Sequence, residues 1–223
     1  MNLIFTKNLE RKVVSEQLGN HFSYDFVEVI RITHLEVPAF DLKNHALIFS
    51  SVNGVESFFK NGFEPVEDCR SEAYNRIFVV GQKTKAALRR HGFGAFKTLR
   101  YARELSDFIM ANFPREKFLH FCGNLSLDIL DRRLPLQNIS YRKISVYRTD
   151  LLFPKIQKPY DAVAFFSPSG VRSFLKHNSV QGKLLFSIGY TTEKELKKYT
   201  DTPVITSSES NAADLLKLIR RQT

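Results

Sequence analysis

The chain has very little sulfur and no tryptophan. Its 223 residues include 2 cysteines, 2 methionines and 0 tryptophans. Two cysteines, Cys69 and Cys122, cannot form a disulfide framework, so we expect a reducing compartment. No stretch approaches the roughly 20 apolar residues that span a bilayer, and the N-terminal MNLIFTKNLERK lacks the apolar run of a secretory leader. These absences predict a cytoplasmic protein without a membrane anchor.

The common catalytic and cofactor motifs are also missing. There is no GxxxxGK[ST] loop or GxSxG elbow, and GFGAF (92–96) lacks the third glycine of a dinucleotide fingerprint. The 6 histidines are scattered, without the HExxH or Cys/His spacing of a zinc site. His120 and Cys122 share one face of a predicted strand, which we interpret as core packing. We therefore expect no metal site.

Positive charge is in excess. Lys and Arg number 33 against 23 Asp and Glu, which gives a net charge of +10 and a pI near 9.6. This balance suits a nucleic acid, an anionic membrane or a multiply acidic small molecule as partner. No RRM, KH or helix-turn-helix signature accompanies the charge, which weakens the nucleic-acid interpretation.

Short apolar runs alternate with segments of helical periodicity along the whole chain. We predict strands at 3–6, 26–37, 46–51, 77–81, 95–99, 118–122, 139–149, 162–167, 184–189 and 204–206. We predict helices at 9–18, 53–61, 83–91, 103–112, 126–133, 169–177, 192–199 and 212–221. Repeated βα units of this kind predict an α/β fold with parallel sheets and helices on both faces.

The βα pattern is duplicated. ALIFSSVNGVESFFKNG (46–62) returns as AVAFFSPSGVRSFLKHN (162–178), 116 positions later. VGQKTKAALRRHG (80–92) and IGYTTEKELKKYT (188–200) match as well, and ARELSDFI (102–109) matches AADLLKLI (212–219) more weakly. Because the matches keep their order, we predict two similar α/β domains with flavodoxin- or Rossmann-like layering, not a solenoid.

The two long predicted strands suggest how the domains connect. We expect residues 1–37 plus 150–223 to form one domain and residues 38–149 the other. A two-stranded β-ladder hinge, at about 30–38 and 141–150, would join them. Ligands of paired α/β domains usually bind in the cleft between them, at the carboxyl ends of the strands.

Each strong strand ends in a small polar turn that opens a helix. The turns are SVNG (51–54), GQKT (81–84), GNLS (123–126), SPSG (167–170) and GYTT (189–192). Free backbone N–H groups at a helix N-terminus bind carboxylate or phosphate. Ordinary N-capping explains any single turn equally well. Their recurrence in both halves favours a shared anion-binding cleft.

Taken together, these segments resemble the uroporphyrinogen-III synthase family. The resemblance rests on LIFSSVNGVESF (47–58), VVGQKT (79–84), FCGNLSLDIL (121–130), ISVYRT (144–149), FFSPSGVRSFLKH (165–177) and SIGYTTEKEL (187–196). It implies a cofactor-free enzyme of two α/β domains that cyclises hydroxymethylbilane, a linear tetrapyrrole with eight carboxylates, inverting ring D through a spiro intermediate.

The resemblance also implies site residues. Tyr147 matches the family's cleft tyrosine and is expected to assist departure of the substrate hydroxyl, although it could merely pack on the hinge strand. The matching cleft hydroxyls, with the polar turns around them, give the expected substrate-binding set: Ser51, Asn53, Thr84, Gly123, Asn124, Ser167, Ser169, Gly189, Thr191 and Thr192. The family often has Thr where Ser50 stands and Pro where Tyr190 stands.

Two other functions stay open on the sequence. One is a two-domain sensor of an anionic ligand that performs no chemistry, and the other is a basic nucleic-acid-binding protein. For the enzyme we expect a monomer that binds neither nucleic acid nor membrane, and a transient handover of substrate from hydroxymethylbilane synthase.

Overall fold

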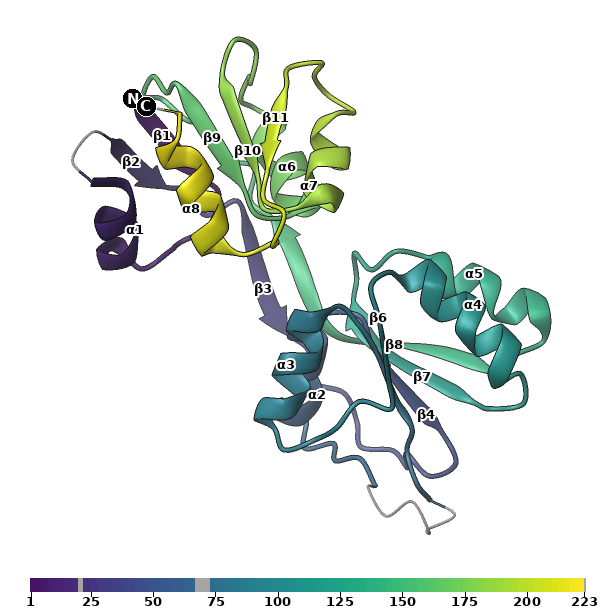
Figure 1. The fold of residues 1–223 in the computed structure, drawn as a ribbon. Helices are drawn as coiled ribbons and strands as arrows, with labels where there is room; N and C mark the ends of the chain where they lie inside the picture. The colour runs from purple at the N-terminus through teal and green to yellow at the C-terminus, as the bar shows by residue number, and fades with distance from the viewer. Residues whose placement is uncertain (20–21, 67–72, 223) are drawn as a thin grey trace. The chain divides into compact units, whose positions relative to one another are not determined.

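The computed structural model describes residues 1–19, 22–66 and 73–222, so Cys69 lies outside the described residues. The chain divides into two compact units. Unit 1 comprises Met1–Arg31 and Asp150–Thr223, and unit 2 comprises Ile32–Thr149. The predicted α/β class with parallel sheets is confirmed in both units (Figure 1).

Unit 1 is a five-stranded sheet with the order β11-β10-β9-β1-β2, parallel at every pairing. Its strands are β1 (Asn2–Phe5), β2 (Ser23–Phe26), β9 (Ala162–Phe165), β10 (Leu184–Ser187) and β11 (Val204–Thr206). Its helices are α1 (Arg11–Leu18), α6 (Pro168–Leu175), α7 (Tyr190–Leu196) and α8 (Ala212–Arg220). All four residues of the central strand β9 are buried, as expected for a strand with both faces covered.

Helices cover both faces of this sheet (Figure 1). Helices α1 and α8 pack against one face through side chains such as Val14 and Leu215. Helices α6 and α7 pack against the other face, where Phe174 and Leu196 are fully buried. Apolar residues spaced three or four apart on each helix form the buried stripe.

Unit 2 is a six-stranded sheet with the order β3-β8-β7-β4-β5-β6. Its strands are β3 (Ile30–His34), β4 (Ala46–Phe49), β5 (Ile77–Val80), β6 (Lys97–Leu99), β7 (Phe118–Gly123) and β8 (Tyr141–Leu151). Its helices are α2 (Val52–Lys60), α3 (Gln82–Arg90), α4 (Ala102–Asn112), α5 (Ile129–Arg133) and the 3₁₀ turn η2 (Pro135–Gln137). Strands β4 to β8 pair in parallel.

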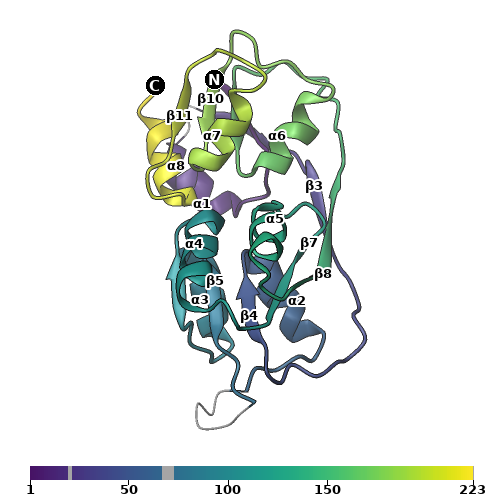
Figure 2. The same ribbon diagram turned by 90° about the vertical axis from the view of Figure 1, so that its right-hand side faces the viewer.

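The core of unit 2 is unusually aromatic on one face. Helices α2 and α3 cover Phe49 and Phe121, and Phe58 meets Phe121 edge to face with ring centroids 4.7 Å apart. Helices α4 and α5 cover the opposite face, where Ile48 and Phe78 are fully buried. Figure 2 shows α5 beside β7 and β8.

The single long strand predicted at 26–37 is wrong. The structure has two short strands, β2 and β3, separated by residues 27–29. The break is anchored, because the Val27 N–H donates to the Phe5 carbonyl at 2.8 Å and Val29 is buried. Strand β2 pairs with β1, whereas β3 pairs with β8, so the chain changes sheets here. The β-branched run concealed this change of partner.

The ends of β3 and β8 run antiparallel. The Leu35 N–H donates to the Val146 carbonyl, and the Leu152 N–H donates to the Val29 carbonyl, both at 3.0 Å. Partner numbers that fall on one strand as they rise on the other define an antiparallel pair.

An asparagine after the first helix of each matched segment makes the duplication visible in hydrogen bonds. Asn61 Oδ1 accepts from the Val37 N–H at 2.8 Å, and its amide donates to the carbonyls of Leu35 and Ser57. Asn178 does the same with the N–H of Ile156 and the carbonyls of Pro154 and Phe174. Asn61 thus links the end of α2 to the backbone just after β3, and Asn178 links the end of α6 to the backbone just after β8.

Candidate functional site

In unit 2, strands β5, β4 and β7 end side by side at the carboxyl edge of the sheet, next to β8, which continues to Leu151. The order β8-β7-β4-β5 brings together the carboxyl ends of strands that are far apart in sequence. Tyr147 lies on β8 opposite Gly123 of β7, and Ser51 follows β4. The structure therefore collects three of the predicted site residues at the edge where ligands of parallel sheets bind.

Ser51 is the N-cap of α2. Its Oγ accepts a hydrogen bond from the Gly54 N–H at 3.0 Å and lies 3.0 Å from the Tyr147 hydroxyl. The two hydroxyls own two hydrogens and share one bond, so one hydrogen is left over for another acceptor. The pair thus combines helix capping with one hydroxyl hydrogen that it does not use itself.

Tyr147 is held tightly. Only 9% of the residue is exposed, and a Cβ added at Gly123 would overlap its ring. Burial raises the pKa of the Tyr147 phenol, against smaller lowering effects of the bonds to Ser51 and the Gly123 backbone. The phenol therefore stays protonated at neutral pH and acts as a neutral hydroxyl.

The other predicted residues of unit 2 are less free to contact a ligand, because they are shielded from solvent or bonded within the protein. Thr84 of α3 is buried, with 4% exposed, and Asn53 is half-buried in the first turn of α2. The Asn124 side chain is bonded to the Thr149 backbone, accepting from its N–H at 2.8 Å and donating to its carbonyl at 3.4 Å. Asn124 therefore fastens the end of β7 to β8.

Unit 1 repeats the capped turn with a different partner. Ser167 is the N-cap of α6 and accepts from the Gly170 N–H at 3.0 Å, while Pro168 occupies the first helical position. The Ser167 hydroxyl lies 3.1 Å from that of Ser169. The capping serine of unit 1 thus contacts another serine, whereas the capping serine of unit 2 contacts the phenol of Tyr147. Only the pair in unit 2 contains a phenol, which is the stronger acid.

The start of α7 separates two adjacent threonines. Thr191 is exposed, whereas Thr192 is 1% exposed and its N–H donates to the Gly189 carbonyl at 3.0 Å. Tyr190 is 61% exposed. A Cβ on Gly189 would lie 2.6 Å from Ser210 Oγ, so the Ser210 side chain packs directly against this glycine and would have to move for any larger residue.

Unit 2 also contains a buried hydrogen-bond chain, beginning at Ser50 beside Ser51, that was not predicted from the sequence. His120, 1% exposed, lies between the hydroxyls of Ser50 and Tyr141, at 2.7 Å from Nε2 and 2.6 Å from Nδ1. The Tyr141 hydroxyl donates to Asp131 at 2.6 Å, and Lys143 pairs with the same carboxylate at 2.8 Å. A histidine inside the apolar strand FLHFCG was the available signal, because a buried polar group requires partners.

Burial lowers the pKa of His120 from 6.5 to about 4, while the charge of Asp131 opposes this effect and that of Lys143 adds to it. Between these two pH values the unfolded chain binds a proton that the folded chain does not, so stability falls as pH falls. We expect the free energy of unfolding to drop by about 3 kcal/mol from pH 6.5 to pH 4 through this group. Urea titrations at several pH values measure it. A His120→Gln variant should lose this component, and an equal slope in both proteins would contradict it.

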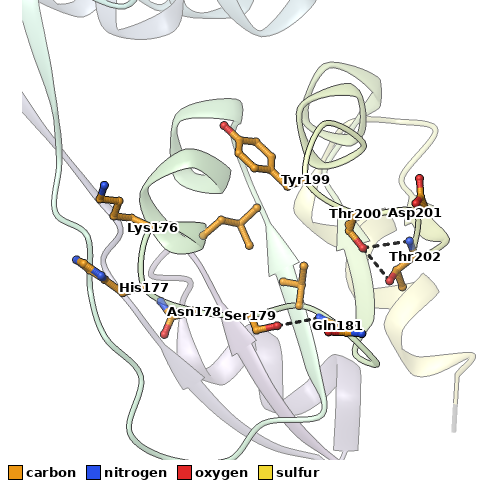
Figure 3. A pocket seen from close by; sticks show the side chains of 11 residues that line it. Lys176, His177, Asn178, Ser179, Gln181, Tyr199, Thr200, Asp201 and Thr202 are labelled. Atoms are coloured by element: carbon orange, nitrogen blue, oxygen red, sulfur yellow. Dashed lines mark hydrogen bonds between the residues drawn. The ribbon is translucent and has the colours of Figure 1, made fainter.

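A hollow of about 770 Å³ lies elsewhere, where α6 and α7 end (Figure 3). It is lined by Leu175–Gln181 and Tyr199–Thr202, at the amino ends of β10 and β11. Helix C-termini present carbonyls and not N–H groups, so an anion here would depend on side chains such as Lys176 and His177 and not on the backbone. The hollow is large, but its backbone lacks the helix N-terminal N–H groups that the carboxyl edge offers to an anion.

Within the described ranges, no set of three or more His, Cys, Asp or Glu side chains is arranged to hold a metal ion. In the same residues, no helix has the length and apolar character needed to cross a membrane.

Known proteins of one family resemble this chain. The family model for uroporphyrinogen-III synthase HemD matches residues 25–217. No curated protein sequence matches significantly. The uroporphyrinogen-III synthetase structure from Helicobacter pylori superimposes with a TM-score of 0.68 at 16% identity, covering 100% of this chain and 99% of that one. A mutant uroporphyrinogen III synthase from Thermus thermophilus gives 0.70 at 16% identity, covering 99% and 98%. At 16% identity, these superpositions show that the fold is shared and carry no further conclusion.

Proposed function

The chain belongs to the uroporphyrinogen-III synthase family, since the family model covers residues 25–217, and we propose that it cyclises hydroxymethylbilane to uroporphyrinogen III. The family match carries this proposal. The Ser51–Tyr147 pair at the carboxyl edge of unit 2 supports it by supplying a place for the chemistry. The reaction releases one water, so the enzyme would be a hydro-lyase.

The proposed reaction needs positioning more than strong acids or bases. Loss of the terminal hydroxyl gives an azafulvene, and the electron-rich substituted carbon of ring D attacks its electrophilic exocyclic carbon. The spiro intermediate then breaks its older bond at that ring carbon and recloses with ring D inverted. The ring carbon finally loses a proton, which balances the proton taken up by the departing hydroxyl. Holding reactants in one geometry is worth several kcal/mol of barrier.

Tyr147 is proposed to assist the first step. Its phenol is neutral because burial raises its pKa, so it donates a hydrogen bond to the departing hydroxyl, directly or by way of Ser51 at 3.0 Å. The donor strengthens its bond as negative charge develops on the leaving oxygen, which is electrostatic stabilisation of the transition state.

The remaining predicted residues are proposed to bind carboxylates. Helices α2 and α6 each begin after a capping serine that follows a strand. Their first-turn N–H groups therefore lie at the carboxyl edge of their own sheet. A net charge of +10 favours a ligand with eight carboxylates. Because several backbone groups would share the carboxylates, no single residue is expected to be essential for binding.

Distributed binding predicts graded effects for single substitutions. Thr191→Ala, at an exposed threonine, should raise KM a few-fold and leave the melting temperature unchanged. Thr192→Ala, at the buried neighbour, should instead lower the melting temperature. Steady-state kinetics and thermal melting of both variants separate the two roles. Complete loss of turnover in a folded Thr191→Ala protein would contradict distributed binding.

Product analysis separates this function from its alternatives. The enzyme yields isomer III, whereas a sensor that binds the tetrapyrrole without chemistry shifts the melting temperature and leaves only the spontaneous isomer I. A nucleic-acid-binding protein retains labelled DNA or RNA with a strong salt dependence.

We further propose a cytoplasmic monomer that receives its substrate from hydroxymethylbilane synthase. Gel filtration tests the oligomeric state.

A further inference from the structure

A buried imidazole connects the carboxyl edge of unit 2 to a carboxylate that is paired with a lysine. His120 Nε2 lies 2.7 Å from Ser50 Oγ, and Nδ1 lies 2.6 Å from the Tyr141 hydroxyl. Ser50 immediately precedes Ser51 and is half-buried, whereas His120 is 1% exposed. The proposed reaction above uses none of these groups except Ser51.

The positions of the hydrogens along the hydrogen-bonded side chains Ser50, His120, Tyr141 and Asp131 follow from counting donors. The Tyr141 hydroxyl has one hydrogen, and it goes to Asp131 at 2.6 Å. Burial disfavours ionisation of Asp131, but the bonds from Lys143 and Tyr141 outweigh it and lower the pKa of this carboxyl, which is therefore charged. Tyr141 oxygen can then only accept from the imidazole, so Nδ1 of His120 carries the hydrogen.

The other ring nitrogen is consequently bare. Burial lowers the pKa of His120 to about 4, so the ring is neutral at physiological pH and carries a single N–H. Nε2 therefore accepts, and the hydroxyl hydrogen of Ser50 points inward to it. Ser50 oxygen keeps its lone pairs for an incoming group and has no hydrogen to give.

We propose that Ser50 contacts the substrate as an obligatory hydrogen-bond acceptor for a pyrrole N–H, and that His120, Tyr141 and Asp131 are positioning residues that fix this polarity. The choice of a pyrrole rests on the proposed function, whereas the polarity follows from the contacts alone.

Two adjacent hydroxyls thereby gain opposite roles. The Ser51–Tyr147 pair keeps one hydrogen for an oxygen of the ligand, while Ser50 offers only lone pairs. A carboxylate at Ser50 would meet a like partial charge, and a pyrrole N–H would be satisfied. A site that pairs a specific N–H discriminates against groups lacking it, because an unmatched buried polar group is costly. Ser50 would thus orient a pyrrole ring beside the hydroxyl-donating pair.

The polarity can be measured without substrate. In the full chain labelled with ¹⁵N-histidine, the His120 signals are assigned by their absence in His120→Gln. Between pH 6 and 8 we expect a pyridine-type shift at Nε2 and a pyrrole-type shift at Nδ1. Tyr141→Phe should mix the two tautomers, because the phenol no longer requires a hydrogen from Nδ1. The opposite tautomer in the wild-type protein, or an unchanged tautomer in Tyr141→Phe, would overturn the proposed relay.

Kinetics then test the contact with substrate. Ser50→Ala should lower kcat/KM about 5- to 10-fold, the cost of one unmet hydrogen bond, and Ser50→Thr, which keeps the hydroxyl, should stay within about 2-fold. Tyr141→Phe should lower kcat/KM although Ser50 is intact. The matched control is Ser106→Ala on α4, a buried serine whose hydroxyl donates to the Arg103 carbonyl at 2.7 Å and accepts from Arg133 at 2.6 Å, apart from the His120 chain.

The failures are distinguishable. If the wild-type protein makes no isomer III, the proposed function fails while the tautomer result stands by itself. If the protein is active and Ser50→Ala turns over like Ser106→Ala, the contact with Ser50 is refuted and the proposed function survives.

Discussion

Tyr147→Phe should lower kcat about 100-fold, at the lower end of what a positioned proton donor contributes. The substitution removes one hydroxyl and leaves the ring in place against Gly123. The loss should fall on kcat more than on KM, because the bond to the departing hydroxyl strengthens only in the transition state. Stability should change by only about 1 kcal/mol, the net worth of the bond to Ser51. Single-turnover kinetics with freshly prepared hydroxymethylbilane measure the effect.

A matched control for this variant is Tyr160→Phe in unit 1. The Tyr160 hydroxyl donates to the Ser179 carbonyl at 2.6 Å and lies away from the carboxyl edge of its sheet. Its removal should leave kcat unchanged. Turnover of Tyr147→Phe equal to that of Tyr160→Phe would remove the catalytic role and leave Tyr147 as a packing residue.

Gly54→Ala should destabilise unit 2 by about 1–3 kcal/mol, although alanine is the better helix former by nearly 1 kcal/mol. A Cβ at this position would lie 2.6 Å from the backbone carbonyl oxygen of Phe121, so α2 must move away from β7. Because Ser51 caps α2, the movement also displaces the Ser51–Tyr147 pair, and turnover should fall. Urea denaturation and amide hydrogen exchange in β7 measure the destabilisation.

The duplicated helix of unit 1 supplies the control. At Gly170 the nearest atoms to an added Cβ are the side-chain atoms Ser167 Oγ and Val29 Cγ2, each at 3.1 Å. Side chains yield more easily than a backbone carbonyl, so Gly170→Ala should cost less than about 1 kcal/mol. Equal losses in the two variants would contradict this reading of the two helix–strand contacts.

The sequence was most informative where one local pattern decides the structure. The matched segments at 46–62 and 162–178 form the same strand, capped turn and helix, since the buried runs and the capping serines act within a few residues. The strand predicted at 26–37 failed because the choice of sheet depends on distant partners, Phe5 for Val27 and Leu152 for Val29. Apolar periodicity carries no information on which sheet a residue joins.

The site shows the same division. Ser51 and Tyr147 were proposed from their place in motifs, and the structure adds their contact at 3.0 Å. The burial of Thr84 and Thr192 could not be predicted, because it depends on how each helix is rotated against its sheet. The chain Ser50–His120–Tyr141–Asp131 joins residues on three separate segments, so only coordinates reveal it.

The ratio of product isomers tests the central claim most directly. Fresh hydroxymethylbilane is incubated with increasing amounts of the protein, the products are oxidised, and the type I and type III porphyrins are resolved. We predict that the type III fraction rises with protein concentration toward nearly all of the product, and that Tyr147→Phe requires far more protein for the same fraction. Type I product alone, at every concentration of folded wild-type protein, would contradict the account.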